Sequence, residues 1–243
     1  TSCAPRRSTD AARIDSVRTQ AEELIKAQSL MGWNSWTRGT ASNQDSLYKA
    51  HTNLFTTEHV ALVHQAERAE HDPVQKKRLG YLRRYLTTEF IGKEIAALTD
   101  RVSNIESNAN VVFEGKQIPF RQVNAMIMNE ARQERRAGLY AALDPVLDSL
   151  TLVLREIEQA NQRLSKELGY TSYNAMSGEL KGPSLEQLKS VTGYVLAQSE
   201  STYAALLPEM TRKYLKPTPA LLYRYDMGAL FRSPSFDKYF PGP

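Results

Sequence analysis

Four histidines are the residues of this chain best suited to bind a metal ion, and they stand at His51, His59, His64 and His71. A zinc site of the HExxH type needs two histidines four residues apart on one helical face, with a glutamate beside the first. That pattern is absent from the sequence. His59 and His64 are separated by roughly 140° around a helix. We therefore predict no metal ligand and no bound cofactor in this chain.

Residues for nucleophilic catalysis are equally scarce. The single cysteine, Cys3, lies at the N-terminus of the sequence. No serine occupies a strand–turn–helix elbow, the setting that activates it in hydrolases. No glycine-rich loop of the kind that binds phosphates occurs either. The sequence thus predicts no catalytic residue.

Cys3 has neighbours that suggest a modification. Two small residues, Thr1 and Ser2, precede it, and the polar stretch 4–9 follows. This pattern resembles the end of a bacterial lipoprotein signal, in which the cysteine becomes lipidated. It predicts a flexible tether over residues 1–9, a lipid anchor at Cys3, and a location in the bacterial cell envelope or periplasm. An incidental cysteine in a cytoplasmic protein is the alternative.

Composition sets broader limits. The 243 residues are 41% hydrophobic and 24% charged, with a formal net charge of +4. These values are typical of a globular protein and exclude wholesale disorder. Basic and acidic residues are interleaved, which argues against a nucleic-acid partner. No apolar run approaches the ~20 residues of a transmembrane helix.

Helical periodicity dominates the elements that would position any site. We predict helices over about 10–31, 43–70 and 73–105, where Asp72 caps the third helix and Pro73 takes its first position. A further helical pattern runs from Val123 through residue 136, and another from about 147 to 168. A last helix starts at Ser184, which forms a capping box with Gln187. Residues 10–243 are predicted as a single helical domain of long antiparallel helices.

Two segments depart from this helical pattern. Residues 111–118 are β-branched and aromatic around Glu114, Gly115 and Lys116, and they predict a small β-hairpin. Residues 32–39 contain two glycines and both tryptophans. We expect this stretch to be a loop whose indoles close the end of a helical bundle.

Arg132, Arg135 and Arg136 form a basic cluster with two acidic neighbours, Glu130 and Glu134. Their spacing places them on one face of the helix predicted there. Such a face is commonly solvated. The alternative is a structural ion-pair cluster, because the planar fork of arginine can hold a carboxylate by two hydrogen bonds.

Residues 129–136 and 164–176 resemble the N-terminal half of the helical zinc oligopeptidases. These are the oligoendopeptidase F and thimet oligopeptidase group, with the angiotensin-converting-enzyme-like dipeptidases as relatives. In that group an arginine-rich helix precedes a helix ending in a Leu-Gly-Tyr-x-x-Tyr type connector, here residues 168–173. The tail 231–241 is similar too. The resemblance covers roughly residues 91–243.

The resemblance implies a nearly all-helical enzyme that cleaves short peptides in a channel between two halves. Its zinc would be bound by an HExxH motif and a downstream glutamate, all beyond Pro243, in a C-terminal catalytic half that this sequence lacks. The chain would then be the lid and channel wall of the enzyme and inactive alone. The alternative hypothesis is a free-standing helical binding or scaffolding module.

Overall fold

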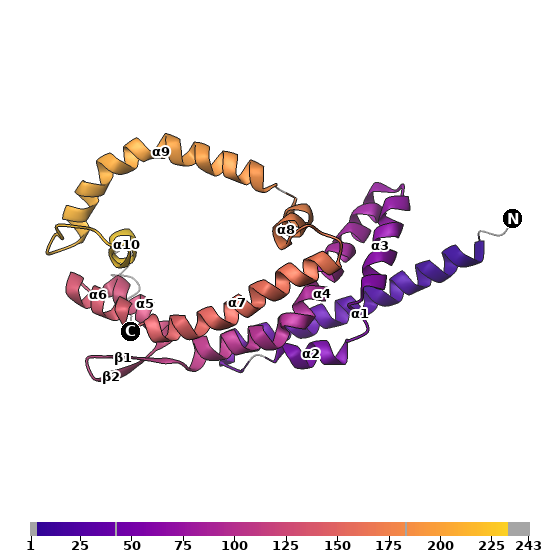
Figure 1. Ribbon diagram of the computed structural model, residues 1–243, viewed down its shortest axis with the longest axis horizontal. Helices are drawn as coiled ribbons and strands as arrows, with labels where there is room; N and C mark the ends of the chain where they lie inside the picture. Colours follow the sequence, from indigo (N-terminus) through magenta and orange to yellow (C-terminus); the bar gives the residue numbers. More distant parts are fainter. Residues whose placement is uncertain (1–3, 42, 183, 233–243) are drawn as a thin grey trace. The chain divides into compact units, whose positions relative to one another are not determined.

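The structure, a computed structural model, describes residues 4–41, 43–182 and 184–232, with side chains from residue 10 onward. Cys3 and most of the 231–241 tail lie outside the described residues. The described part is mainly helical with one two-stranded antiparallel sheet (Figure 1), as the sequence predicts. The helices are α1 (Ala4–Arg38), α2 (Gln44–Ala50), α3 (Thr57–Ala69), α4 (Pro73–Asn108), α5 (Phe120–Asn129), α6 (Gln133–Ala141), α7 (Asp144–Glu167), α8 (Tyr173–Lys181), α9 (Leu185–Tyr214) and α10 (Arg224–Phe231). The strands are β1 (Asn110–Phe113) and β2 (Lys116–Pro119).

The chain divides into two compact units. Unit 1 contains Thr1–Asn104 and Leu152–Gly182, and unit 2 contains Ile105–Thr151 and Pro183–Pro243. The chain passes between the units at three points, of which two fall inside helices, in α4 and in α7, and the third falls between α8 and α9. The hydrophobic periodicity, from which one domain over 10–243 is predicted, carries no signal of this division.

Two hydrophobic clusters lie among the described residues of unit 1. The larger one joins α1, α2, α3 and α4 around Leu24, Leu54, Val63 and Leu86, each almost fully buried. The smaller one joins α4, α7 and α8 around Ile91, Leu164, Met176 and Leu180. Because each helix contributes apolar residues at helical spacing, the periodicity seen in the sequence is the direct cause of this packing.

A buried tyrosine links α2 to α4 beside the larger cluster. The Tyr48 hydroxyl donates to the carboxylate of Glu89, and Gln28 donates to the same carboxylate at 3.2 Å. Burial, together with the hydrogen bond to Glu89, raises the pKa of Tyr48. A Cβ at Gly92 would come within 2.8 Å of the Tyr48 hydroxyl oxygen, so glycine is needed there.

The first helix is longer than predicted. α1 begins at Ala4, inside the expected tether, and continues through Gly32 to Arg38. Gly39, at a φ of 67°, follows its end, and the Gly39 N–H donates to the Ser35 carbonyl. A glycine inside a helix costs only about 1 kcal/mol, and that was too little to end this helix at Gly32.

The prediction of a tryptophan-bearing loop is therefore wrong. Trp33 and Trp36 lie on α1, and their side chains are 65% and 92% exposed. Within the part of the chain that the structure describes, neither indole closes the end of a bundle.

The predicted helix over 43–70 is also wrong in its continuity, because the structure divides it into α2 and α3. Thr56 caps α3 by accepting the His59 N–H at 3.2 Å. Leu54 and Phe55 are buried in the connection between the two helices. Because these two residues are apolar, the hydrophobic pattern of the sequence continues across the break between α2 and α3. The helical periodicity therefore does not reveal this break. The predicted start of α4 is confirmed, since the Asp72 carboxylate accepts the Gln75 N–H at 2.8 Å.

Unit 2 contains the predicted hairpin. β1 and β2 pair antiparallel, with Val111 opposite Ile118 and both buried. Glu114 and Gly115 form the turn, at φ values of 49° and 75°. Two consecutive positive φ values define the type I′ turn whose twist suits a two-residue hairpin.

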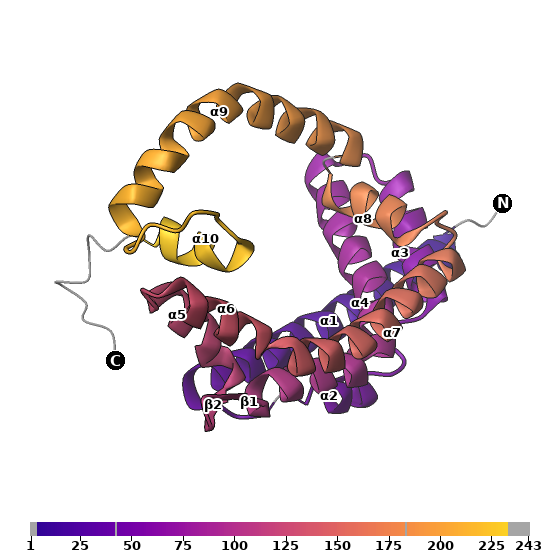
Figure 2. The ribbon, with the colours of Figure 1, turned by 60° about the vertical axis from the view of Figure 1, so that its left-hand side comes forward.

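α9 and α10 complete unit 2. The predicted capping box of Ser184 and Gln187 is present at the start of α9. Pro208 lies inside α9, which runs through it as a continuous, curved helix (Figures 1 and 2). α10 contacts α5, α6 and α9, and the rings of Tyr203 and Phe231 stack between α9 and α10.

The exposed indoles give the first testable prediction. We expect the tryptophan fluorescence of the chain to be close to that of tryptophan in water, because both residues are largely exposed. Iodide should quench most of it, and unfolding in urea should shift the emission very little. A blue-shifted emission that moves to longer wavelength on unfolding would show that the indoles are buried, as the sequence analysis expects, and would contradict this prediction.

Candidate functional site

The three arginines singled out in the sequence do not share one helical face. A break between α5 and α6 separates Arg132 from the two that follow, since α6 begins at Gln133. At the break, the Glu130 carboxylate accepts the backbone N–H of Arg132 at 2.9 Å. This local side-chain bond competes with helical hydrogen bonding. The prediction of one continuous helix over 123–136 is therefore wrong.

Arg136 forms a buried ion pair with Asp226 of α10. Both side chains are 0% exposed. The Arg136 Nε donates to Asp226 Oδ1 at 2.8 Å, and Nη2 lies 2.7 Å from the same oxygen. A buried ion pair is stable only when its remaining donors and acceptors are also satisfied.

Arg136 Nη1 and Asp226 Oδ2 also have hydrogen-bond partners, whereas Arg136 Nη2 makes only the ion-pair contact and no hydrogen bond of good geometry among the described residues. Arg136 Nη1 donates to the carbonyl oxygens of Glu130 and Ala131, at 2.9 and 2.8 Å. These carbonyls follow the C-terminus of α5, where a positive charge is favourable. Asp226 Oδ2 accepts from the Gln133 side chain at 2.7 Å and from the Tyr223 N–H at 2.8 Å. The pair thus ties the end of α5, the start of α6 and the start of α10 together.

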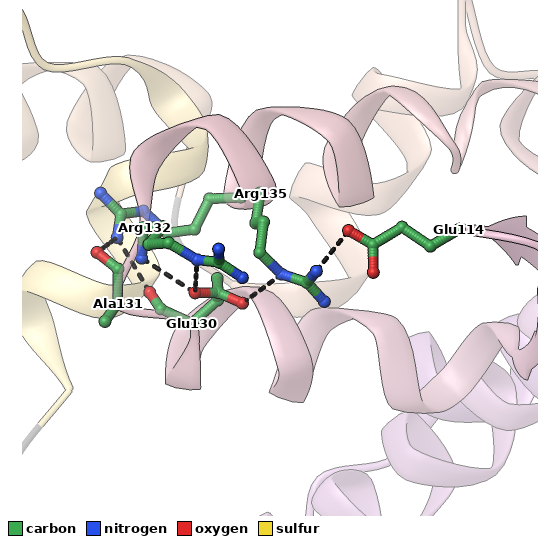
Figure 3. Close-up of polar contacts among 6 residues, drawn as sticks. Glu114, Glu130, Ala131, Arg132 and Arg135 are labelled. Atoms are coloured by element: carbon green, nitrogen blue, oxygen red, sulfur yellow. Dashed lines mark hydrogen bonds and ion pairs between the residues drawn. The ribbon is translucent and has the colours of Figure 1, made fainter.

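Arg135 makes a second, more exposed set of contacts, drawn in Figure 3. Its Nε donates to Glu130 Oε2 at 2.7 Å, and its Nη1 donates to Glu114 in the hairpin turn. Its guanidinium also lies over the ring of Phe113, 5.3 Å from the centroid. Arg135 therefore connects the hairpin to the α5–α6 break.

Glu130 is the shared acceptor of this set. Hydrogen bonds from the Arg132 backbone N–H and then from the Arg135 side chain hold the pKa of Glu130 below its usual value. Figure 3 shows Arg132 and Arg135 turned toward the same carboxylate. The Arg132 side chain itself is largely exposed, with its Nε 3.7 Å from Glu130.

Two glycines leave room for side chains that pack around the cluster. A Cβ on Gly228 would lie 2.9 Å from the Met128 side chain, where α10 crosses α5. A Cβ on Gly138 would lie 2.8 Å from the Phe113 ring, where the hairpin meets α6. Tyr225 stacks on Tyr223 and packs against Tyr140 beside the ion pair. The whole arrangement is a packed junction.

Chemically, this junction holds charges in place. Each carboxylate in it faces an arginine, and an arginine stays protonated at every physiological pH. Glu130, whose pKa is lowered, is therefore kept ionised, and the carboxylates of both Glu130 and Asp226 are occupied by hydrogen bonds. The arrangement can position α10 against α5 and α6, which is the role of a structural ion-pair cluster.

Asp226 and Gln133 are the members of the junction that sequence reasoning missed. The pattern of an acidic residue three positions after Tyr223, at the start of a short helix, was the available signal. It marks a helix start and says nothing about the arginine ninety residues earlier in the sequence that would pair with it.

The described histidines do not form a metal-binding cluster. His59 Nδ1 lies 2.8 Å from the Leu54 carbonyl oxygen, a local contact. Among the described residues, no group of three or more His, Cys, Asp or Glu side chains could hold a metal ion. Cys3 lies outside the described residues, so its lipidation and the envelope location stay predictions from sequence.

Comparison with protein-family models, curated proteins and solved structures finds no match for this chain. In the described ranges, no single helix has the length and apolar composition of a membrane span. One helix pair, α6 with α7, meets those criteria jointly across a 42° bend.

Lysine substitution of the three arginines should separate their roles. Arg136→Lys leaves buried acceptors unpaired, and we expect it to lower the free energy of unfolding by roughly 2–5 kcal/mol. Arg132→Lys should change it by no more than about 0.5 kcal/mol, the range of surface substitutions. Arg135→Lys should fall between them. Urea unfolding curves check this order, and three curves that overlay the parent would show that the cluster does not contribute to the free energy of unfolding.

Glu130 gives a prediction about acid stability. Because its pKa is lowered in the folded state, its contribution is present above the ordinary glutamate pKa and is lost as the pH falls through the folded value. Unfolding free energies measured from pH 7 to pH 3 should therefore fall less steeply in Glu130→Gln than in the parent. Glu134→Gln, on the exposed side of α6, is the control and should keep the parental slope. A parental slope in Glu130→Gln would rule out this contribution.

Proposed function

We propose that this chain is the non-catalytic N-terminal part of a zinc-dependent peptidase that hydrolyses short peptides. The motifs in residues 129–136 and 164–176 first suggested this assignment. In this proposal the chain supplies a helical wall of the substrate channel, and residues outside it bind the zinc and activate water. No step of the chemistry is assigned to the side chains described above.

The exposed apolar face of α9 is the observation that most supports the proposal. Among the residues of α9, Thr211 alone is buried. Large apolar side chains along the helix are exposed: Leu185, Leu188, Val191, Tyr194, Val195, Leu196, Tyr203, Leu206 and Tyr214. Most of them recur at intervals of three, four or seven residues, which places them along one broad stripe of the helix.

An exposed apolar stripe of this length indicates a surface that contacts another protein segment. Proteins that act as monomers rarely expose a continuous apolar patch of this kind, and larger patches mark a surface that contacts another protein segment. A 30-residue helix spans about 45 Å, which is long enough to line one side of a domain. We infer that the stripe packs against the catalytic half of the proposed enzyme.

Leu188→Gln tests this assignment in two contexts. In the 243-residue chain the side chain is exposed, and we expect its substitution to change the free energy of unfolding by no more than about 0.5 kcal/mol. In the complete enzyme the same leucine would be buried, so we expect a loss of about 1–3 kcal/mol, with lower peptide hydrolysis. Lys189→Gln, one residue along α9, is the matched control and should change neither protein.

Activity measurements complete the test. The complete protein should hydrolyse short peptides in a reaction that a zinc chelator abolishes, and the 243-residue chain should hydrolyse none. A complete protein with no chelator-sensitive hydrolysis, in which Leu188→Gln is as mild as in the chain alone, would contradict the proposal. That outcome would favour the alternative, a free-standing helical binding module.

A further inference from the structure

Unit 1 contains a groove between α1, α3 and α4 that the proposed peptidase function does not use. Its volume is about 1300 Å³. Pockets for drug-sized ligands are typically about 300–1,000 Å³, so this groove is larger than a small molecule requires. All of its lining residues belong to unit 1.

The floor of the groove is apolar and continuous with the core. Ile14, Leu79 and Leu82 line it and also pack against the larger hydrophobic cluster. Ile25, 42% exposed, and Leu62 extend the apolar surface on α1 and α3. Ala66 and Ala69 contribute small side chains on α3 that leave room for a neighbouring backbone.

The length of the groove suits a helix. Its α1 wall runs from Asp10 to Ile25. At 1.5 Å per residue this is about 22 Å, or about four turns of a docked α-helix. Helix-in-groove recognition uses an apolar helical stripe of this length, read by anchors at i, i+3, i+4 and i+7.

The charges on the rim favour a basic occupant. The acidic residues that line the groove are Asp10, Asp15, Glu22 and Glu70, and the lining arginines are Arg18 and Arg78. Acidic side chains are thus in excess here, although the chain as a whole carries a net charge of +4. Asp10 and Asp15 are paired with Arg13 and Arg18, at 3.9 and 3.1 Å, and Glu70 accepts the backbone N–H groups of His71 and Asp72. Glu22 on the α1 rim and Glu70 across the groove then outnumber the remaining lining arginine, Arg78. This reversal of sign gives electrostatic complementarity to lysines and arginines.

We propose that this groove binds an amphipathic α-helix of a partner protein, with its apolar stripe on the floor and basic residues against the acidic rim. The proposal is independent of the peptidase assignment, because it concerns unit 1 and requires no metal. It gives the chain a binding site for a cationic helical segment.

The test uses two synthetic amphipathic peptides of 18 residues with the same leucine stripe. One carries lysine and the other glutamate beside the stripe. We expect the lysine peptide to bind the chain in a saturable 1:1 complex, followed by fluorescence anisotropy, at least tenfold more tightly than the glutamate peptide. Its affinity should fall with added salt.

Matched variants locate the site. Ala66→Trp fills the groove and should weaken lysine-peptide binding at least tenfold, whereas Ala61→Trp, on an exposed part of α3 outside the groove, should not. Glu22→Lys should weaken binding, whereas Glu23→Lys on the next position of α1 should not. Circular dichroism and urea unfolding identify any variant that has lost its fold.

Three results would overturn the proposal. The first is the absence of saturable binding, and the second is equal affinity for the two peptides. The third is a chain that is dimeric by light scattering and becomes monomeric with Ala66→Trp, because a second copy would then be the occupant.

Discussion

The buried pair of Arg136 and Asp226 is the contact on which the arrangement of unit 2 depends. It joins α6 to a helix ninety residues later in the chain, and it does so with both side chains removed from water. Removing two charges from water is expensive, and hydrophobic residues of similar size can often replace such a pair without loss of stability. Its contribution is therefore best understood as geometric. The planar guanidinium can donate to all of its partners only when the end of α5 and the start of α10 both lie beside it.

The placement of α10 connects this junction to the proposed function. α10 contacts α9 through the stacked rings of Tyr203 and Phe231, and it contacts α5 where Gly228 meets Met128. The ion pair thus fixes the position of α10, which packs against the C-terminal half of α9, the helix that carries the exposed apolar stripe. In the proposed enzyme, a junction held in this way would set how that stripe meets the catalytic half.

Local signals predicted much of the fold. The hairpin at 111–118, the Asp72 cap and the Ser184 capping box involve residues within a few positions of each other, so the sequence contains all of their partners. The three helix boundaries that were predicted wrongly share one cause. Gly32 did not end α1, buried residues continued the apolar spacing across the α2–α3 break, and a helical pattern was interrupted beside the Glu130 carboxylate. In each case a contact or a small energy difference that periodicity does not report decided the outcome. The pairing of Arg136 with Asp226 is tertiary, and one sequence alone gives no means of finding it.

A double-mutant cycle on this pair tests the central claim most directly. Urea unfolding of Arg136→Met, Asp226→Leu and the double variant would give the coupling free energy between the two side chains. If the pair holds α5, α6 and α10 together, each single variant strands a buried charge, and the double variant should be much more stable than the sum of the single effects implies. We predict a coupling of about 2–3 kcal/mol. A coupling near zero, with additive single effects, would show that unit 2 does not depend on this contact.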